Sequence, residues 1–97
     1  MERGGCVYIL TNITHSVFYT GVTSDLFIRI SEHRNKLYPL SFTAKYNCYK
    51  LVYFEQLSTI EEAIGREKQL KNWRRDWKIE LINANNPRWN DLFQDLK

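Results

Sequence analysis

The sequence of 97 residues predicts an α/β domain of the α+β type, in which about three helices flank a small, mainly antiparallel three-stranded sheet. Two short runs rich in β-branched and aromatic residues, at 7–11 and 17–22, are separated by turn formers. A third run with alternating polarity follows at 49–55. A chain of this length supports one modest core, so residues 1–97 are expected to form a single domain.

The first two strands form a predicted hairpin, with Asn12, Thr14 and Ser16 as its turn residues. If residues 13 and 14 make the tip, residue 10 pairs with residue 17, and Tyr8 lies opposite Tyr19. Their Cβ atoms would then be about 5 Å apart on one face of the sheet. A symmetric lengthening of the loop keeps this pairing, whereas a loop of odd length breaks it.

The first helix follows the second strand, which is expected to end at Gly21. Thr23 or Ser24 is the expected cap, with Asp25 in the first turn of the helix. We expect the helix to end at Tyr38, because the residue before a proline is driven out of the helical region.

Ionisable groups accompany the core-facing stripe of this helix. The stripe has the spacing i, i+4, i+7, i+11 and consists of Leu26, Ile30, His33 and Leu37. Arg29 lies four residues before His33, so their side chains are neighbours. Two phenols, a guanidinium and an imidazole are therefore expected to converge near one sheet face. Taken singly, each of the four is also a common packing residue, such as a core histidine with a hydrogen-bond partner.

Residues 41–47 are predicted to form a loop between this helix and the third strand. Lys45 and Tyr46 in this loop can face a phosphate and a base, respectively. The alternative is an ordinary exposed lysine beside a packed tyrosine.

The clearest helix covers residues 58–72, where Ser58 with Glu61, or Thr59 with Glu62, forms a capping box. Its apolar stripe consists of Ile60, Ala63, Ile64 and Leu70. Glu67 belongs to the same stripe by its spacing, and a carboxylate there needs a metal or a cation as its partner. A salt bridge to Arg29 or a neighbour, or a side chain reaching the rim, are the alternatives. Gly65 suggests a close approach of this helix to the sheet.

A third helix is predicted over residues 73–84, with Trp77 and Leu81 packed at i and i+4. Its tryptophans either anchor the core or, lying between basic residues, stack on nucleic-acid bases. Pro87 follows the end of this helix, and a short amphipathic segment begins near Trp89.

Composition and charge narrow the class of protein. Hydrophobic residues make up 43% of the chain and charged residues 26%, which is typical of a globular protein. No apolar run reaches the ~18 residues of a membrane span, and two cysteines are too few for a disulfide scaffold. We therefore expect a cytoplasmic protein with reduced thiols, no membrane contact and no organic cofactor.

Positive charge is concentrated in the middle of the chain. Residues 29–50 hold five basic and one acidic residue, and residues 66–78 hold six basic and two acidic residues. Such clusters favour contact with a polyanion, although solvated helix faces also carry them. The clusters therefore favour a polyanion such as a nucleic acid as the partner, and the sequence indicates no particular oligomeric state.

The chain resembles the GIY-YIG endonuclease superfamily, and in particular its small stand-alone bacterial members. The resemblance rests on the tripeptides centred on Tyr8 and Thr20, on Arg29 ten residues after Tyr19, and on His33 four residues later. The segment 63–71 resembles the metal-binding helix of that family, with Glu67 at the ligand position. Two departures are present: Cys6 and Val7 replace the first Gly-Ile, and Thr20 replaces the middle Ile of the second motif.

The resemblance implies a Mg²⁺-dependent DNA endonuclease, with Mn²⁺ as a substitute, acting in DNA repair or recombination. The expected catalytic residues are Tyr8, Tyr19, Arg29, His33 and Glu67, and Glu67 is the metal ligand. One carboxylate holds one Mg²⁺ rather than two, which favours a one-metal mechanism. The expected DNA-binding residues are Lys45, Lys71, Arg74, Arg75 and Asn86.

Several points stay open at the level of sequence. Arg29 suits the scissile phosphate through its planar fork of donors. A tyrosine becomes a general base where nearby cations favour the phenolate, so Tyr8 and Tyr19 are both candidates. His33 is the next candidate, or else it contacts the phosphate. The alternative functions are a DNA-binding module without turnover and a protein-interaction domain.

Overall fold

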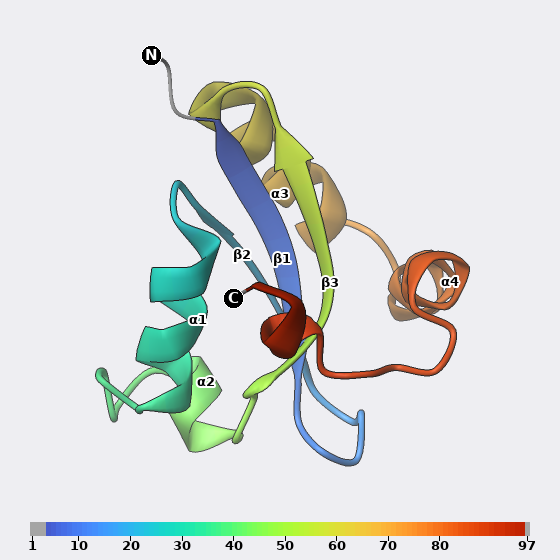
Figure 1. The fold of residues 1–97 in the computed structure, drawn as a ribbon. Coiled ribbons are helices and arrows are strands. Elements are labelled where there is room, and N and C mark those ends of the chain that lie inside the picture. The colour runs from blue at the N-terminus through green and yellow to red at the C-terminus, as the bar shows by residue number, and fades with distance from the viewer. Residues whose placement is uncertain (1–3, 97) are drawn as a thin grey trace.

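The computed structural model describes residues 4–96, and it confirms the predicted α/β fold with a three-stranded antiparallel sheet (Figure 1). In chain order the elements are β1 (Gly5–Thr11), β2 (Phe18–Thr23), α1 (Leu26–Arg34), α2 (Phe42–Lys45), β3 (Lys50–Leu57), α3 (Ile60–Lys71), α4 (Arg75–Asn85) and the 3₁₀ helix η1 (Leu92–Leu96). Within residues 4–96, no helix is both long enough and apolar enough to cross a membrane.

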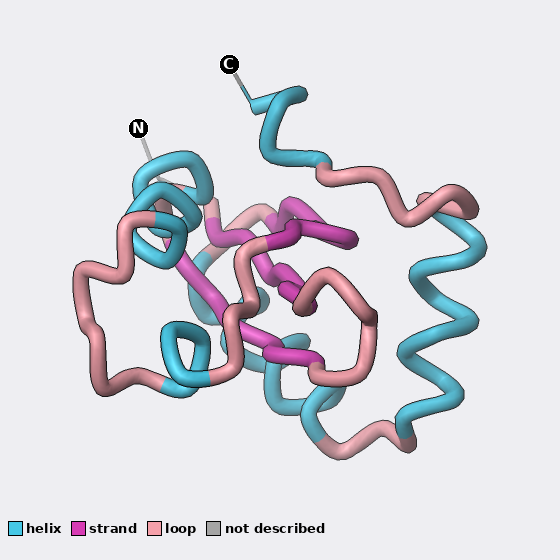
Figure 2. Tube along the Cα trace, turned by 90° about the horizontal axis from the view of Figure 1, so that it is seen from below, coloured by secondary structure: helices cyan, strands magenta, loops and turns pink. Residues whose placement is uncertain are grey.

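The sheet has the strand order β2-β1-β3, so β2 is an edge strand. One face carries Tyr8 and Leu10 and packs against Ile30 of α1 and against η1. The other face carries Val7 and Ile9 and packs against α3 and α4. Figure 2 shows the sheet enclosed between these two helical layers. Because β1 is covered on both faces, it is buried along its whole length.

The hairpin register differs by two residues from the predicted one. Tyr8 pairs with Gly21, and Tyr19 pairs with Leu10, so the predicted pairing of Tyr8 with Tyr19 was wrong. The Asn12 side-chain oxygen accepts the backbone N–H groups of residues 16 and 17, at 2.9 and 3.1 Å. This Asx-type turn widens the loop to residues 12–17. A shift by two preserves the face, so both tyrosines still lie on one side of the sheet.

Helix α1 begins and ends at residues other than those predicted. Asp25, rather than Thr23 or Ser24, is the N-cap, and it accepts the backbone N–H of Ile28 at 3.1 Å. The helix ends at Arg34, four residues before the predicted end. Lys36 adopts φ 50°, and the amide of residue 37 bonds to the carbonyl of residue 32. This Schellman closure uses a lysine in place of the usual glycine, so the sequence carried no stop signal.

The segment after α1 leaves the core, and part of it is helical. Leu37 is 56% exposed, so its predicted place on the buried stripe was wrong. Residues 42–45 form the short helix α2 instead of a loop, because the Ser41 hydroxyl caps them by accepting the Ala44 N–H.

Helix α3 matches its prediction closely. Thr59 caps it by accepting the N–H of Glu62, and the helix buries Ala63 and Leu70 against the sheet. Ile64 was expected on that stripe but is 38% exposed. Gly65 faces solvent, and a Cβ added to it would meet no atom within 4 Å, so the expected close approach to the sheet is absent there.

Helix α4 starts at Arg75, two residues later than predicted, and leaves Trp73 in the connection from α3. Its fully buried residue is Ile82, which packs against Ile9 and Val52. Trp77 is 42% exposed and is therefore not the core residue that the spacing predicted.

Candidate active site

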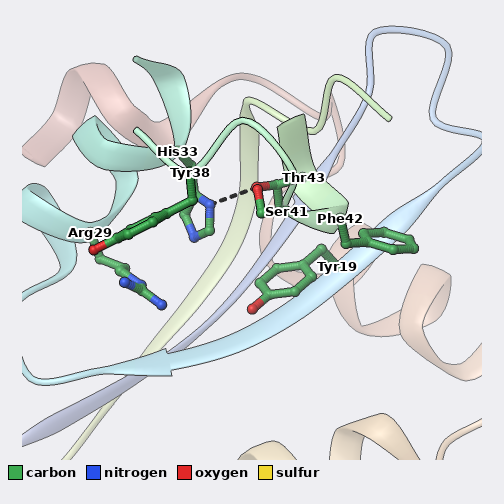
Figure 3. Close-up of a pocket in the computed structure, with 7 residues that line it drawn as sticks. All are labelled: Tyr19, Arg29, His33, Tyr38, Ser41, Phe42 and Thr43. Carbon is green, nitrogen blue, oxygen red and sulfur yellow. Dashed lines mark hydrogen bonds between the residues drawn. The ribbon is translucent and has the colours of Figure 1, made fainter. Parts of the chain in front are cut away.

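A cleft of about 500 Å³ lies between β2, α1 and the segment that leads into α2 (Figure 3). Its lining consists of Tyr19, Arg29, His33, Tyr38, Ser41, Phe42 and Thr43. In Figure 3 the Arg29 guanidinium and the Tyr19 hydroxyl extend toward one another, and Phe42 lies at the far end. Three of the five predicted catalytic residues therefore meet at one solvent-accessible surface.

Tyr8 lies behind this cleft rather than on its surface, because its side chain is completely buried. Its hydroxyl is 3.0 Å from His33 Nε2, and its ring centroid is 6.3 Å from that of Tyr19. Gly21 makes room for the ring: a Cβ at residue 21 would lie 2.4 Å from the Tyr8 Cζ and hydroxyl atoms. The glycine of the second motif thus matters for packing and not for backbone conformation, since its φ is negative.

His33 holds both of its ring nitrogens in hydrogen bonds. Nε2 faces the Tyr8 hydroxyl at 3.0 Å, and Nδ1 faces the Thr43 hydroxyl at 2.8 Å. Burial, and secondarily the charge of Arg29, lower the pKa of the imidazole below its ordinary value. His33 is therefore neutral at neutral pH, and one nitrogen accepts a hydrogen bond while the other donates one.

Burial is also the main reason that the pKa of the Tyr8 phenol lies well above its ordinary value, and the nearby Tyr19 phenol and the Glu67 carboxylate raise it further. Arg29 opposes this effect, because its positive charge near the Tyr8 hydroxyl favours the phenolate. A phenol in this position stays protonated, so its O–H can donate a hydrogen bond to His33 Nε2. Arg29 also pairs with Glu32 at 3.2 Å, which orients the guanidinium along α1.

Glu67 comes from α3, the helix that contacts the edge strand β2 as well as β1. Its side chain is only 15% exposed, and one carboxylate oxygen lies 3.2 Å from Lys71 Nζ, one helical turn later. Of the alternatives that the sequence left open, the structure shows the ion pair with a neighbour and not one with Arg29. Among residues 4–96 there is no cluster of three His, Cys, Asp or Glu side chains suited to a metal ion.

Basic residues of α3 and α4 gather beside the cleft. Lys71 and Lys78 line a shallow pocket together with Tyr19 and Phe42, which also line the cleft. Burial lowers the pKa of Lys78, and the charges of Arg75 and Lys71 lower it further. This repulsion shows that three cations lie close together, an arrangement that an anion would stabilise.

The other predicted DNA-binding residues take different positions. Arg74 pairs with Asp76 at 3.2 Å and lies over the Trp77 ring, and Lys45 is exposed on α2. Asn86 is 5% exposed, and its side-chain amide bonds to the carbonyls of Val52 and Asn90. These bonds hold the chain after α4 against the sheet, so the side chain of Asn86 is engaged in the fold and is not counted among the residues of the site.

Sequence reasoning missed the contributions of the segment around α2 and of Lys78. Thr43 is buried and orients His33, while Tyr38 and Phe42 form cleft walls. The available signal was Ser41, which precedes a short run able to form one helical turn. That signal places a helix but not its contact with His33.

The fold and the cleft together define a small α/β domain with a polar cleft beside its edge strand β2. The family model of the GIY-YIG catalytic domain matches residues 4–80, so the chain belongs to this family. GIY-YIG is a family of nucleases. The resemblance inferred from the sequence is thereby confirmed.

Particular relatives carry the name UPF0213 protein. The one from Syntrophus aciditrophicus is 33% identical over 79 residues, covering 81% of this chain and 90% of that protein. One from Clostridium perfringens is 38% identical over 78 residues, covering 80% of this chain and 82% of the relative. The solution NMR structure of a UPF0213 protein from Bacillus halodurans has a TM-score of 0.57 at 27% identity, covering 91% of this chain and 92% of that one.

Proposed function

We propose that this domain is an endonuclease that hydrolyses phosphodiester bonds of DNA, with one Mg²⁺ held at Glu67. The observation that carries the proposal is the meeting of Tyr19, Arg29 and His33 in one cleft beside a group of close cations. Mn²⁺ is an acceptable substitute, because the same oxygen ligands suit both ions. DNA repair and recombination are the processes in which we expect such an activity to act.

Arg29 is the proposed ligand of the scissile phosphate. Its guanidinium lines the cleft, and two parallel donors can meet two phosphate oxygens. Hydrolysis increases the negative charge on those oxygens, so oriented donors stabilise the transition state more than the ground state. Glu32 keeps the guanidinium in place before the substrate arrives.

Tyr19 is the proposed group that meets the attacking water. Its ring borders the cleft, and no hydrogen bond engages its hydroxyl within residues 4–96 of the apo structure. Tyr8 and His33 are less suited to this task, because they already bond to each other and His33 bonds to Thr43. We assign Tyr8 and Thr43 as positioning residues that fix the tautomer and orientation of His33 beside the phosphate.

Glu67 fits a single divalent cation better than two. It is a mostly buried carboxylate whose charge reaches the Tyr8 phenol, and Mg²⁺ completes its shell with water and phosphate oxygens. When bound, the ion would neutralise developing charge on the phosphate and on the leaving oxygen. Lys71 holds the carboxylate in the apo protein, and its ammonium is free to bind a phosphate once Glu67 has another partner.

The test is a cleavage assay at millimolar Mg²⁺ with Glu67→Gln and the matched control Glu62→Gln. Glu62 is an exposed residue in the first turn of the same helix, so its substitution leaves the site intact. We expect Glu67→Gln to abolish cleavage while the circular dichroism spectrum is retained, and Glu62→Gln to cut at the wild-type rate. Equal cutting by wild type and Glu67→Gln would refute the metal assignment.

A second function, DNA binding without turnover, is favoured by the Lys71–Glu67 pair, which satisfies the carboxylate in the absence of metal. It would be the correct function if the wild-type protein binds DNA yet releases no cleaved product at any Mg²⁺ or Mn²⁺ concentration.

A further inference from the structure

A row of aromatic rings leads away from the catalytic cleft. We call it the aromatic track, and it consists of the exposed rings of Tyr38, Phe42 and Tyr46 and the half-buried ring of Tyr49. Tyr38 is 56% exposed, Phe42 45% and Tyr46 41%, although burying such rings is ordinarily favourable. Large rings left open beside a cleft need an explanation from what they contact when a ligand binds.

Ring contacts and shared pockets link the residues of the track, and Tyr38 lines the catalytic cleft together with Phe42. The Phe42 centroid is 6.0 Å from that of Tyr19 in the cleft and 4.7 Å from that of Tyr46. Tyr46 and Tyr49 in turn line a second pocket, of about 410 Å³, beside the β1–β2 loop. The catalytic cleft and this pocket are therefore joined through the Phe42–Tyr46 contact.

Cations accompany the track. Lys45 Nζ lies 5.4 Å from the Tyr46 ring centroid, and Lys36 Nζ lies 5.5 Å from that of Tyr49. From residue 33 to residue 54 the sequence has four basic residues and no aspartate or glutamate. Asp91, which reaches this region from the C-terminal segment, is already paired with Arg34. The track thus combines open π-faces with positive charge that no carboxylate of its own segment cancels.

Single-stranded DNA has the complementary chemistry, because it offers unstacked bases to aromatic rings and phosphates to lysines. A duplex keeps its bases stacked inside the helix and offers the rings little. We propose that the aromatic track binds an unpaired DNA strand next to the scissile phosphate, so that the substrate class is DNA with a single-stranded segment. This proposal rests on the proposed nuclease function for its purpose, but the binding itself needs no catalysis.

The binding test uses a fluorescently labelled twelve-nucleotide oligo-dT and a duplex of the same length, in EDTA. The variants are Tyr46→Leu, which removes the ring, and Tyr46→Phe, which retains it. Removing one stacking ring should weaken oligo-dT binding about fivefold or more. Tyr46→Phe should bind oligo-dT within about twofold of wild type, and duplex affinity should hardly change in either variant, because stacking needs the ring and an accessible base.

Two further variants keep the result specific. Tyr38→Leu removes a ring at the cleft end and should also weaken oligo-dT binding. Phe27→Leu is the control outside the track: this ring is 43% exposed, as the track rings are, but it lies on α1 and stacks on Phe93. It should leave oligo-dT affinity unchanged. Circular dichroism verifies that each variant is folded.

Unchanged oligo-dT affinity in both Tyr46→Leu and Tyr38→Leu would overturn the proposal, as would an equal loss for oligo-dT and duplex. Sedimentation of the apo protein covers the other possible occupant, a second copy of the chain. A dimer that Tyr46→Leu dissociates, with unchanged oligo-dT affinity, would also overturn it.

A cleavage arm separates this proposal from the proposed function. With Mg²⁺, the wild type should cut a duplex bearing a single-stranded flap faster than a plain duplex, and Tyr46→Leu should lose that preference. Ring-dependent oligo-dT binding without any cleavage would refute the nuclease function and support the track. Cleavage with no flap preference and no ring-dependent binding would do the reverse.

Discussion

The contact between Gly21 and Tyr8 gives the sharpest test of how the site is built. In Gly21→Ala the added Cβ would lie 2.4 Å from the Cζ and hydroxyl atoms of Tyr8, a distance that real atoms do not share. The Tyr8 ring is completely buried, so it moves only by displacing its neighbours. Overpacking of this kind costs about 1–3 kcal/mol. Alanine recovers about 0.5–1 kcal/mol of that, because it loses less backbone entropy than glycine in a strand.

Contacts of 2.4 Å with two atoms of a buried ring place the cost in the upper half of that range, about 2–3 kcal/mol, so the expected net destabilisation is about 1–2.5 kcal/mol. For a domain of this size it lowers the thermal midpoint by about 4–20 °C, measured by circular dichroism. The displaced ring also loses its bond to His33, so cleavage under single-turnover conditions should fall even at temperatures where the variant is folded.

Gly65→Ala is the matched control, because Gly65 lies exposed in α3 with nothing near its Cβ position. It should stabilise the protein by about 1 kcal/mol, since alanine is the better helix former. In a Tyr8→Leu background, Gly21→Ala should cost much less than in the wild type, because the colliding ring atoms are gone. A Gly21→Ala protein with the wild-type midpoint and cleavage rate, or equal costs in the two backgrounds, would refute the reasoning.

Three further predictions concern turnover and DNA binding. Arg29→Lys should lower the single-turnover cleavage rate by about 10²–10³, nearly as much as Arg29→Ala, because the transition state needs the two parallel donors of the guanidinium. It should keep most of its DNA affinity, because attraction to phosphates depends mainly on charge. Cleavage within threefold of wild type would limit Arg29 to anchoring DNA. Duplex affinity should fall with salt with a slope of log K against log salt near roughly −3.6, for about four neutralised phosphates, and a slope near zero would leave the basic surface without a role in binding. Burial and Arg29 lower the pKa of His33, so folding favours its neutral form; stability and cleavage should hold above about pH 6.5 and fall as the pH drops below it. His33→Asn should remove the acid dependence of cleavage, and the control His15→Asn should keep it. Because burial also lowers the pKa of His15, part of the acid dependence of stability should persist in His33→Asn. An acid limb of cleavage that persists in His33→Asn would assign it to another group.

Local periodicity was enough to determine several features of the site. A strand alternates its side chains, so Tyr8 and Tyr19 share a face in any register shifted by two residues. Arg29 and His33 are neighbours because they lie four residues apart on one helix, and the spacing of α3 placed Glu67 on the side that meets the sheet. These relations depend only on bonds along the chain and on the geometry of a single element.

Contacts between distant segments decided the rest. Which tyrosine borders the cleft depends on the glycine opposite Tyr8, and thus on a register set by the side chain of Asn12. The sequence could not indicate that Thr43 would orient His33, because that bond joins residues ten apart through an irregular segment. Nor did the two glycines differ in their local patterns: Gly21 is required by a ring from another strand, whereas Gly65 faces open solvent. A residue's spacing determines its face, but the atoms that fill the space beside it come from other parts of the fold.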